Sequence, residues 1–577
     1  YDSVSAAIDA TQAYNKDTNK GLYTITLNEN LAEDVVIPEG RYIKIDLNGH
    51  TLTNKESHTI FNNSTRITIV DTSAEKTGVV DNISHGRGAV YNNINAAITL
   101  QGGSYTRSQE ASTGSDASGS NSWYVLKNFG TMTIKDGVTV KFSDSNSGLY
   151  SSLIGNGWQN SSAAEAGSNG EPKSNAGGKQ AKLTINGGTF TGGQITVKND
   201  DYGELTITGG SYTVTAAEHG MTGKDSLAVA GGDFTIISGK DGLHAENADD
   251  SALGFLYVAD GTFTITAQGD AVSASGALQV DGGTFDLTTG GGSASVTMTT
   301  GDSFAPGGMG GGPGGQDGAP LQGDPPAGGE TPPELPDNSG GGQLPELPAQ
   351  PSGSETASAA ETAEGTETAE DTVSQKGVKA DGALTINGGT FTVDSADDCL
   401  HSGGALAVTG GTFTLSSGDD AIHSDDAVTI RAGEFSIPYC YEGVEGLSVT
   451  VEGEAFDVTA HDDGFNAAGG ADSSDFGGMD EPFAASEDSF ITVNGGTITV
   501  VSDGDCLDSN GDLTVNGGTL DLTCNGNGNT ALDCSGSYTN NGGSVTTNDG
   551  SETNSGGRSG NRLEEEREPL PSGRPKA

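Results

Sequence analysis

The chain has 577 residues, 92 of them glycine, and its 79 acidic and 26 basic side chains give a formal net charge of −53. This excess of negative charge argues against binding to nucleic acid or to an anionic membrane surface, because both carry the same sign of charge. The sequence contains no apolar run of about 18 residues, so no segment is predicted to span a membrane.

Residues 1–180 are predicted to form the first coils of a β-solenoid. The stretch SVSAAIDATQAY (3–14) places Val4, Ala7 and Ile8 at helical spacing and predicts a short amphipathic helix that caps one end. These coils belong to the same solenoid as the later repeats or to one that abuts it. Strand-like runs with Gly or Asn-Gly turns follow at 22–54, 66–72, 97–106 and 131–140, and loops rich in Ser, Ala and Gly are predicted at 107–122 and 156–180.

A 22-residue repeat organises residues 181–300 and 377–548. Its clearest copies are LTINGGTFTVDSADDCLHSGG (384–404) and LAVTGGTFTLSSGDDAIHSDD (406–426). Each copy alternates apolar and polar residues on both sides of a Gly-Gly pair, which predicts strand, turn and strand. One unit cannot bury its apolar face alone, whereas stacked units can. We therefore predict an all-β fold, a right-handed parallel β-helix with coils of about 22 residues.

An aromatic side chain recurs two residues after the second glycine of the pair, which we number position 0. Position +2 shares its parity along the strand with the apolar +4 residues, such as Val393 and Leu415, so these aromatics are predicted to stack in the core. An exposed platform for stacking sugars is the alternative. The residues at +2 are Phe190, Tyr212, Phe234, Phe263, Phe285, Phe391, Phe413, Phe435 and Phe456.

Acidic residues recur near position +9. Position +9 holds Asp241, Asp270, Asp398, Asp420, Glu442, Asp463 and Asp505; position +8 adds Asp397, Asp419 and Asp462; position +12 adds Glu445 and Asp508. Adjacent coils lie about 4.8 Å apart, so these residues are expected to form an acid column along one edge. Counting from the glycines puts Val197, His219 and Asn527 at +9 in three further coils, where calcium is not expected.

Two carboxylates about 5 Å apart repel by roughly 3 kcal/mol at an effective dielectric constant near 20. Bound cations would offset that cost, and a ligand set made of oxygen atoms favours Ca²⁺. The alternative is that the acids cap turns by accepting backbone N–H bonds, and the two roles can occur at different coils. His244, His401 and His423, at +12, are expected to face outward and hydrogen-bond the acids; metal ligation is the alternative.

Residues 301–376 interrupt the repeat. They are rich in Gly and Pro and then in Thr, Ala and acidic residues, a composition that cannot bury a core, so we predict a disordered insertion within one coil connection. A smaller loop is expected at 469–487 and a disordered tail at 549–577. The five cysteines lie in strand-like runs and form no metal-binding motif, so they are predicted to be small buried residues.

The later repeats resemble the bacterial β-helix family described as carbohydrate-binding domain-containing protein, over residues 181–300 and 377–548. The segments that carry the resemblance are GKDSLAVAGGDFTIISGKDGLHAEN (223–247), DDAIHSDDAVTI (419–430), YCYEGVEGLSVTVEG (439–453) and VTAHDDGFNAAGG (458–470). The resemblance implies a pectate-lyase-like fold, calcium, binding of cellulose and polygalacturonate, and a secreted or cell-surface location. The segment IDLNGHTL (45–52) resembles the solenoid starts of bacterial surface proteins.

These observations predict a monomeric, non-catalytic protein that binds acidic or cellulosic polysaccharide of the plant cell wall. One alternative is a surface adhesin or scaffold that calcium stiffens. The other is a lyase, which would need a strong base beside the bound uronate. Few basic residues lie near the acid column in the sequence, namely Lys224, Lys240 and Arg431, and a repeated column of acids suits a structural or multivalent role better than an active site.

Overall fold

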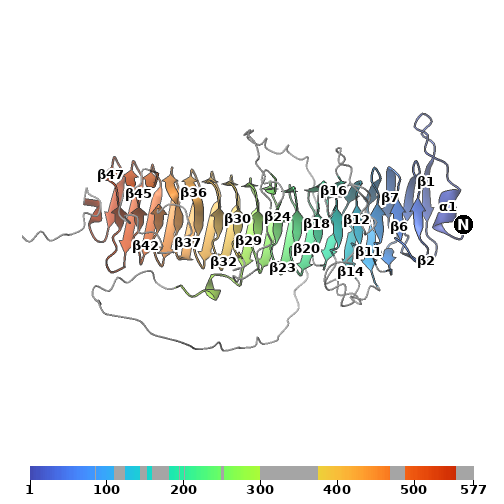
Figure 1. Cartoon of the computed structure of the whole chain (residues 1–577), viewed down its shortest axis with the longest axis horizontal. Helices are drawn as coiled ribbons and strands as arrows, with labels where there is room; N and C mark the ends of the chain where they lie inside the picture. The colour runs from blue at the N-terminus through green and yellow to red at the C-terminus, as the bar shows by residue number, and fades with distance from the viewer. Residues whose placement is uncertain are drawn as a thin grey trace, which may run out of the picture.

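In the computed structural model, the described residues are 1–84, 86–108, 124–142, 152–158, 181–193, 195–200, 202–247, 253–298, 374–467 and 488–553. These residues form one α-helix, short 3-10 turns and strands that stack along a single long axis (Figure 1). The predicted insertion up to residue 373, the predicted loop at 469–487 and the tail from residue 554 lie outside the described residues, as do most of the two predicted N-terminal loops.

The strands form three parallel ladders, and each coil contributes one strand to each ladder. The first ladder contains β1 (Leu22–Thr26), β4 (Tyr42–Asp46), β7 (Arg66–Val70), β10 (Ala97–Leu100), β13 (Thr131–Ile134), β16 (Ala181–Ile185), β19 (Gly203–Ile207), β22 (Ser226–Val229), β25 (Phe255–Val258), β28 (Leu278–Val280), β31 (Leu384–Ile386), β34 (Leu406–Val408), β36 (Ile422–Ile430), β38 (Val444–Val451), β41 (Phe490–Val493), β44 (Asp512–Val515) and β47 (Tyr538–Asn540).

The second ladder is divided into two sheets. One contains β2 (Leu31–Ala32), β5 (Thr51–Thr53), β8 (Val79–Asn82), β11 (Gly103–Arg107), β14 (Val138–Phe142) and β17 (Thr189–Thr191); the other contains β20 (Ser211–Ala216), β23 (Asp233–Ser238), β26 (Thr262–Ala267), β29 (Thr284–Thr289), β32 (Thr390–Ser395), β35 (Thr412–Ser417), β37 (Glu434–Cys440), β39 (Ala455–Ala460), β42 (Thr497–Ser502), β45 (Thr519–Cys524) and β48 (Ser544–Thr547).

The third ladder joins the first through the long strands β36 and β38, which belong to both. Its other strands are β3 (Val35–Ile37), β6 (Ile60–Asn62), β9 (Val90–Asn92), β12 (Leu126–Asn128), β15 (Ile154–Asn156), β18 (Val197–Asn199), β21 (Met221–Gly223), β24 (Leu243–Ala245), β27 (Val272–Ala274), β30 (Val378–Ala380), β33 (Leu400–Ser402), β40 (Phe465–Ala467), β43 (Leu507–Ser509) and β46 (Leu532–Cys534). The protein is therefore nearly all β, with long parallel sheets, as a β-helix-like solenoid requires.

Neighbouring coils place like side chains on top of one another. Phe391 pairs with Phe413, one 22-residue repeat later. All nine aromatic residues predicted at +2 are at most 3% exposed, and their rings stack with centroid distances between 4.4 and 5.7 Å. The core interpretation is confirmed, and the alternative of an exposed sugar platform is wrong, because these rings point into the apolar interior.

The turn that precedes each aromatic residue requires glycine at the second position of the Gly-Gly pair. Gly389 has φ = +118°, in the region that side chains disfavour. A Cβ atom there would lie 3.0 Å from the carbonyl oxygen of Gly283 and 3.1 Å from the Phe391 ring. The second glycine of the pair therefore permits both the backbone turn and the close approach of the preceding coil.

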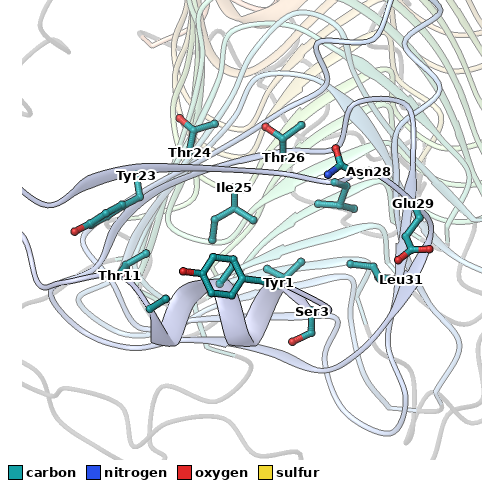
Figure 2. A pocket seen from close by; sticks show the side chains of 14 residues that line it. Tyr1, Ser3, Thr11, Tyr23, Thr24, Ile25, Thr26, Asn28, Glu29 and Leu31 are labelled. Atoms are coloured by element: carbon teal, nitrogen blue, oxygen red, sulfur yellow. The ribbon is translucent and has the colours of Figure 1, made fainter.

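The N-terminal helix α1 (Val4–Asp9) is shorter than the predicted 3–14. Ser3 caps it, because its hydroxyl accepts the Ala6 N–H at 3.0 Å, and Val4 and Ile8 are buried against the first coil. A pocket of about 380 Å³ lies between α1 and β1 (Figure 2), lined among others by Tyr23 and Leu31. This pocket is at the N-terminal end of the solenoid, far from the coils that carry the acid column.

Five buried asparagines form a stack at the ends of β6, β9, β12, β15 and β18. Each donates from its side-chain amide to the side-chain oxygen of the next, at 2.6 to 2.8 Å. Because an amide both donates and accepts, the stack satisfies itself without any charge. The sequence analysis missed this feature. The members of the stack are Asn62, Asn92, Asn128, Asn156 and Asn199.

The ladders continue across both segments where the repeat is interrupted or irregular. β15 pairs with β18 and β13 with β16, so the first coils share the ladders of the later repeats. β27 pairs with β30 across the insertion. The described structure resumes at Ser374, three residues before the boundary at 377 that composition suggested.

All five cysteines are buried, as predicted, and none forms a disulfide in the structure. Among the described residues, we find no helix with the length and apolar character needed to cross a membrane.

We predict that Phe391→Ala lowers the free energy of unfolding by about 3–5 kcal/mol, because it removes one buried ring from the aromatic stack. Thr392→Ala, an exposed substitution on the same strand β32, is the control and is expected to change stability by less than about 0.5 kcal/mol. Urea unfolding followed by circular dichroism measures both. Equal effects of the two substitutions would contradict the assignment of the stack to the core.

Candidate functional site

The acid column lies where each coil enters the third ladder. Strand pairing fixes its order, because Leu243, Val272, Val378, Leu400 and Ile422, all two residues after a +9 residue, are partners in successive coils. Along the solenoid, the residues at +9 are His219, Asp241, Asp270, Lys376, Asp398, Asp420, Glu442, Asp463, Asp505 and Thr530.

Two positions differ from those counted in the sequence, whereas His219 keeps its place at +9. Val197 is a buried residue of β18 and pairs with Met221, so Ile195 occupies +9 in its coil. Thr530 replaces Asn527, because the turn before β46 is longer than in the other coils. Counting from the glycine assigns the wrong residue to +9 wherever a coil connection changes length. The pairing of the following strand assigns the correct residue in every coil.

Most acids at +9 cap the backbone of the next coil. The +10 N–H of one coil donates to the +9 carbonyl of the next, as Cys399 does to Asp420 at 3.0 Å, and leaves the +9 N–H without a strand partner. The +9 carboxylate of the preceding coil accepts it. These bonds are Asp270 N–H to Asp241 (2.9 Å), Lys376 to Asp270 (2.7 Å), Asp420 to Asp398 (3.1 Å), Glu442 to Asp420 (3.2 Å), Asp505 to Asp463 (2.6 Å) and Thr530 to Asp505.

Turn capping, the alternative to calcium in the sequence analysis, is therefore present at these coils. A buried N–H without a partner is costly, and a carboxylate is a strong acceptor for it. Each of these capping bonds uses one oxygen of a carboxylate, so the surroundings of the second oxygen decide what else the residue can do.

A lysine occupies the column between Asp270 and Asp398. The Nζ atom of Lys376 lies 2.7 Å from Asp397 Oδ1 and 2.7 Å from Asp398 Oδ2, and the side chain is 10% exposed. Burial raises the pKa of Asp398, but the His401 hydrogen bond and the charge of Lys376 outweigh it and hold this pKa below the usual range. Lys376 was not predicted from the sequence, because its composition-based boundary places it in the insertion; the alignment of VKA (378–380) with LHS (400–402) identifies it.

The histidines at +12 contact the acids, as predicted. His401 Nδ1 lies 2.8 Å from Asp398 Oδ2, and His423 Nδ1 lies 2.7 Å from Glu445 Oε2 and 3.1 Å from Asp420 Oδ2. Burial lowers the pKa of His423, but the two carboxylates raise it overall to about 12. The prediction that His423 faces outward is wrong: its side chain is 2% exposed, because it is held among Asp420, Asp425 and Glu445.

The C-terminal half of the column has a higher density of negative charge. We call Glu442, Asp463, Asp505 and Asp508, together with Asn466, the C-terminal acid group. Burial and the neighbouring carboxylates, including Asp462 at +8, raise the pKa of Asp463 well above its usual range, and burial with Asp420 and Glu445 does the same for Glu442. Asp533 of the next coil also comes within 4.8 Å of Asp505 and Asp508.

Two buried oxygens in this group make no hydrogen bond to the described residues. Asn466 Nδ2 donates to Glu442 Oε1 at 3.0 Å, which leaves Asn466 Oδ1 and Glu442 Oε2 unsatisfied. A buried acceptor without a donor is expensive unless a cation or a water molecule occupies the space beside it. The donor atoms gathered here are all oxygens.

The predicted metal ligands thus separate into sets with different surroundings. Asp397, Asp398 and Asp419 lie within 4.8 Å of one another, as do Asp420, His423 and Glu445. Lys376 and His423 already provide positive charge to these two sets, and burial and Asp241 raise the pKa of Asp270. The C-terminal acid group has the oxygen donors of a hard-cation site.

We predict that Lys376→Gln lowers the free energy of unfolding at pH 7 by about 3–5 kcal/mol, because it leaves Asp397 and Asp398 without their cation. Lowering the pH should reduce the loss, since Lys376 helps to hold the pKa of Asp398 down and protonation of Asp398 removes the charge that the variant leaves unpaired. Lys379→Gln, at a more exposed lysine that pairs with Asp381 at 3.4 Å, is the control and should have little effect. Urea unfolding at two pH values measures both, and a loss independent of pH would contradict the electrostatic explanation.

Comparison with known proteins gives one match. The model of the family described as carbohydrate-binding domain-containing protein matches residues 179–421 and 419–562. Searches of curated proteins and of solved structures found no match. The two matched segments contain every residue of the acid column from His219 to Thr530 and more than half of the 577 residues. The chain belongs to the carbohydrate-binding domain-containing family.

Proposed function

We propose that this protein binds plant cell-wall polysaccharide of the polygalacturonate or cellulose type without catalysis, and that calcium held by the C-terminal acid group takes part in binding. Family membership supports carbohydrate binding in general. The observation that carries the calcium proposal is the pair of buried oxygens, Glu442 Oε2 and Asn466 Oδ1, which make no hydrogen bond to the described residues.

The C-terminal acid group fits calcium by its donor chemistry. Carboxylate and amide oxygens are the ligands that Ca²⁺ prefers, and it takes six to eight of them in flexible geometry. The raised pKa values of Glu442 and Asp463 express the same repulsion that a divalent cation would relieve. Glu442, Asp463, Asn466, Asp505 and Asp508 would hold the ion. The remaining predicted ligands retain their capping and ion-pair roles in this proposal.

Calcium would also explain how an acidic protein can retain an acidic polymer. A formal charge of −53 repels polygalacturonate, and the repulsion is strongest along a column of carboxylates. An ion bound at the rim of the column can share its remaining coordination positions with uronate carboxylates. Cellulose carries no charge, so the same group would contact it through hydroxyl groups.

The structure gives little support to a lyase. A lyase base must be neutral near the operating pH. Burial lowers the pKa of Lys376, but Asp398 and Asp397 raise it overall, so this lysine stays protonated. Unsaturated product released from polygalacturonate would nevertheless reveal such an activity directly.

The fold and location belong to the same proposal. We infer that the three ladders close into a right-handed parallel β-helix, because their inner faces share one apolar core and parallel crossover connections are right-handed in nearly all proteins. We also infer a monomer that is secreted or held at the cell surface, where a cell-wall polysaccharide is accessible.

We predict that immobilised polygalacturonate retains the protein in millimolar calcium and releases it when excess chelator is added. The double variant Asp463→Asn/Asp508→Asn should lose retention, because it removes two calcium-binding carboxylates. Asp457→Asn/Asp521→Asn changes the charge equally at exposed residues of β39 and β45 and should be retained like the wild type. Bound fraction on the resin is the measurement.

The outcomes separate the alternatives. Retention that survives chelation would show glycan binding without calcium. Absence of retention under either condition, with a melting temperature still raised by calcium, would favour the calcium-stiffened scaffold.

We further predict that calcium at one hundred times its dissociation constant stabilises the wild type by about 2.7 kcal/mol, since it binds the folded state alone. Asp463→Asn should lose this response. In calcium-free buffer the same variant should be at least as stable as the wild type, because it removes like-charge repulsion and its amide oxygen can still accept the Asp505 N–H. Thermal unfolding with and without calcium tests both effects; an unchanged calcium response would place the ion elsewhere.

A further inference from the structure

His219, Asp241 and His244 meet at the N-terminal end of the acid column. His219 precedes β21, and His244 belongs to β24 of the next coil. The Nδ1 atoms of the two histidines lie 3.4 Å and 2.6 Å from the same oxygen, Asp241 Oδ2. Their rings stack with centroids 4.3 Å apart. Two nitrogen atoms and one oxygen atom therefore point to one place from two adjacent coils.

Neighbouring groups fix the orientation of this cluster. Asp241 Oδ1 accepts the Asp270 N–H at 2.9 Å, so its Oδ2 atom faces the histidines. His244 Nε2 lies 3.2 Å from Glu246 Oε2, which turns Nδ1 of the same ring toward Asp241. Metal-binding histidines commonly donate their other ring N–H to a carboxylate in this way. Neither Nδ1 atom makes a hydrogen bond of acceptable geometry within the described structure, although both are buried.

We propose that His219, Asp241 and His244 bind a first-row transition metal ion, with Zn²⁺ as the best match. Zinc takes nitrogen and carboxylate ligands at about 2.0–2.2 Å in tetrahedral geometry, which separates ligand atoms by about 3.3 Å. The two Nδ1–Oδ2 distances, 2.6 and 3.4 Å, are close to that separation. Calcium prefers oxygen ligands, so the site differs in chemistry from the C-terminal acid group.

The cluster also has room for a fourth ligand. A depression of about 260 Å³ opens beside it and is lined by Asp241, His244 and Glu246 among others. Three protein ligands with an accessible fourth position form a common zinc arrangement, in which water completes the coordination.

The other histidines of the column lack this arrangement. His401 faces Asp398, whose second neighbour is the Lys376 ammonium group. His423 lies between Asp420 and Glu445 as the single histidine of its cluster. Among the described residues, the Asp241 carboxylate is the one that two imidazole rings share.

The test uses the full chain, freed of metals and then saturated with calcium to occupy oxygen-rich sites. Co²⁺, a spectroscopic substitute for Zn²⁺, is added and followed by visible absorption. We expect one equivalent to bind with the intense d–d bands of a four-coordinate site, and Zn²⁺ to displace it. Glu246→Ala, which removes a positioning residue, should weaken Co²⁺ affinity by about 10–100-fold.

His219→Gln and His244→Gln should each weaken Co²⁺ binding more than Glu246→Ala does, because each removes a ligand. His401→Gln is the matched control and should bind Co²⁺ like the wild type. His219 lies in a connection outside the strands, so its variant remains informative if His244→Gln fails to fold.

Two results would overturn the proposal. If the folded wild type binds no Co²⁺, the histidines serve only as counter-ions of Asp241. If Co²⁺ binds equally well to His219→Gln and His244→Gln, the ion occupies another site. Neither result bears on calcium-dependent glycan retention, which depends on other residues.

Discussion

The exact repetition of parallel coils is the constraint on which the rest of this structure depends. Adjacent strands lie about 4.8 Å apart, so each side chain is placed beside the side chain at the same position of the next coil. For Phe391 and Phe413 this is favourable, because stacked rings fill the core. For Asp398 and Asp420 it is unfavourable, because like charges are brought together at the edge. The same in-register stacking therefore stabilises the core and brings the carboxylates of the column close enough to repel one another.

The repulsion along this edge is avoided or offset by different side chains in different coils. In the early coils, Asn62 to Asn199 form a neutral stack in which each amide satisfies the next. In the later coils carboxylates take over the edge, and backbone N–H groups, Lys376 and His423 offset part of their charge. These partners are unevenly distributed, and two buried oxygens of the C-terminal acid group have no donor among the residues that the structure describes. In the function proposed above, calcium neutralises this surplus.

The sequence predicts the features that recur in every coil, and it does not predict the positions of residues where the repeat is interrupted. The 22-residue period and the Gly-Gly turns identify the strands, the core aromatics and the edge that carries the acids. Lys376 was not predicted to lie in the column. The insertion separates it from Gly283, the glycine of its own coil, so counting residues from that glycine does not assign Lys376 to position +9. The burial of His423 depends on Glu445 from the next coil, which no single repeat contains. The asparagine stack was not predicted, because a single Asn after a strand is equally typical of an ordinary turn.

A column with unequal parts suits a repeating ligand that needs more than one kind of contact. Family membership indicates carbohydrate binding, but a carboxylate already used in capping a backbone N–H contributes mainly to folding. Only charge left after capping and ion pairing is available to a cation or a glycan. By that criterion the middle of the column, around Lys376 and His423, is structural. The two ends differ in donor chemistry, oxygen alone at Asp463 and Asp505, nitrogen with oxygen at Asp241. Binding capacity is therefore expected to reside at the ends of the column. There, buried oxygens of Glu442 and Asn466 and ring nitrogens of His219 and His244 make no hydrogen bond within the part of the chain that the structure describes.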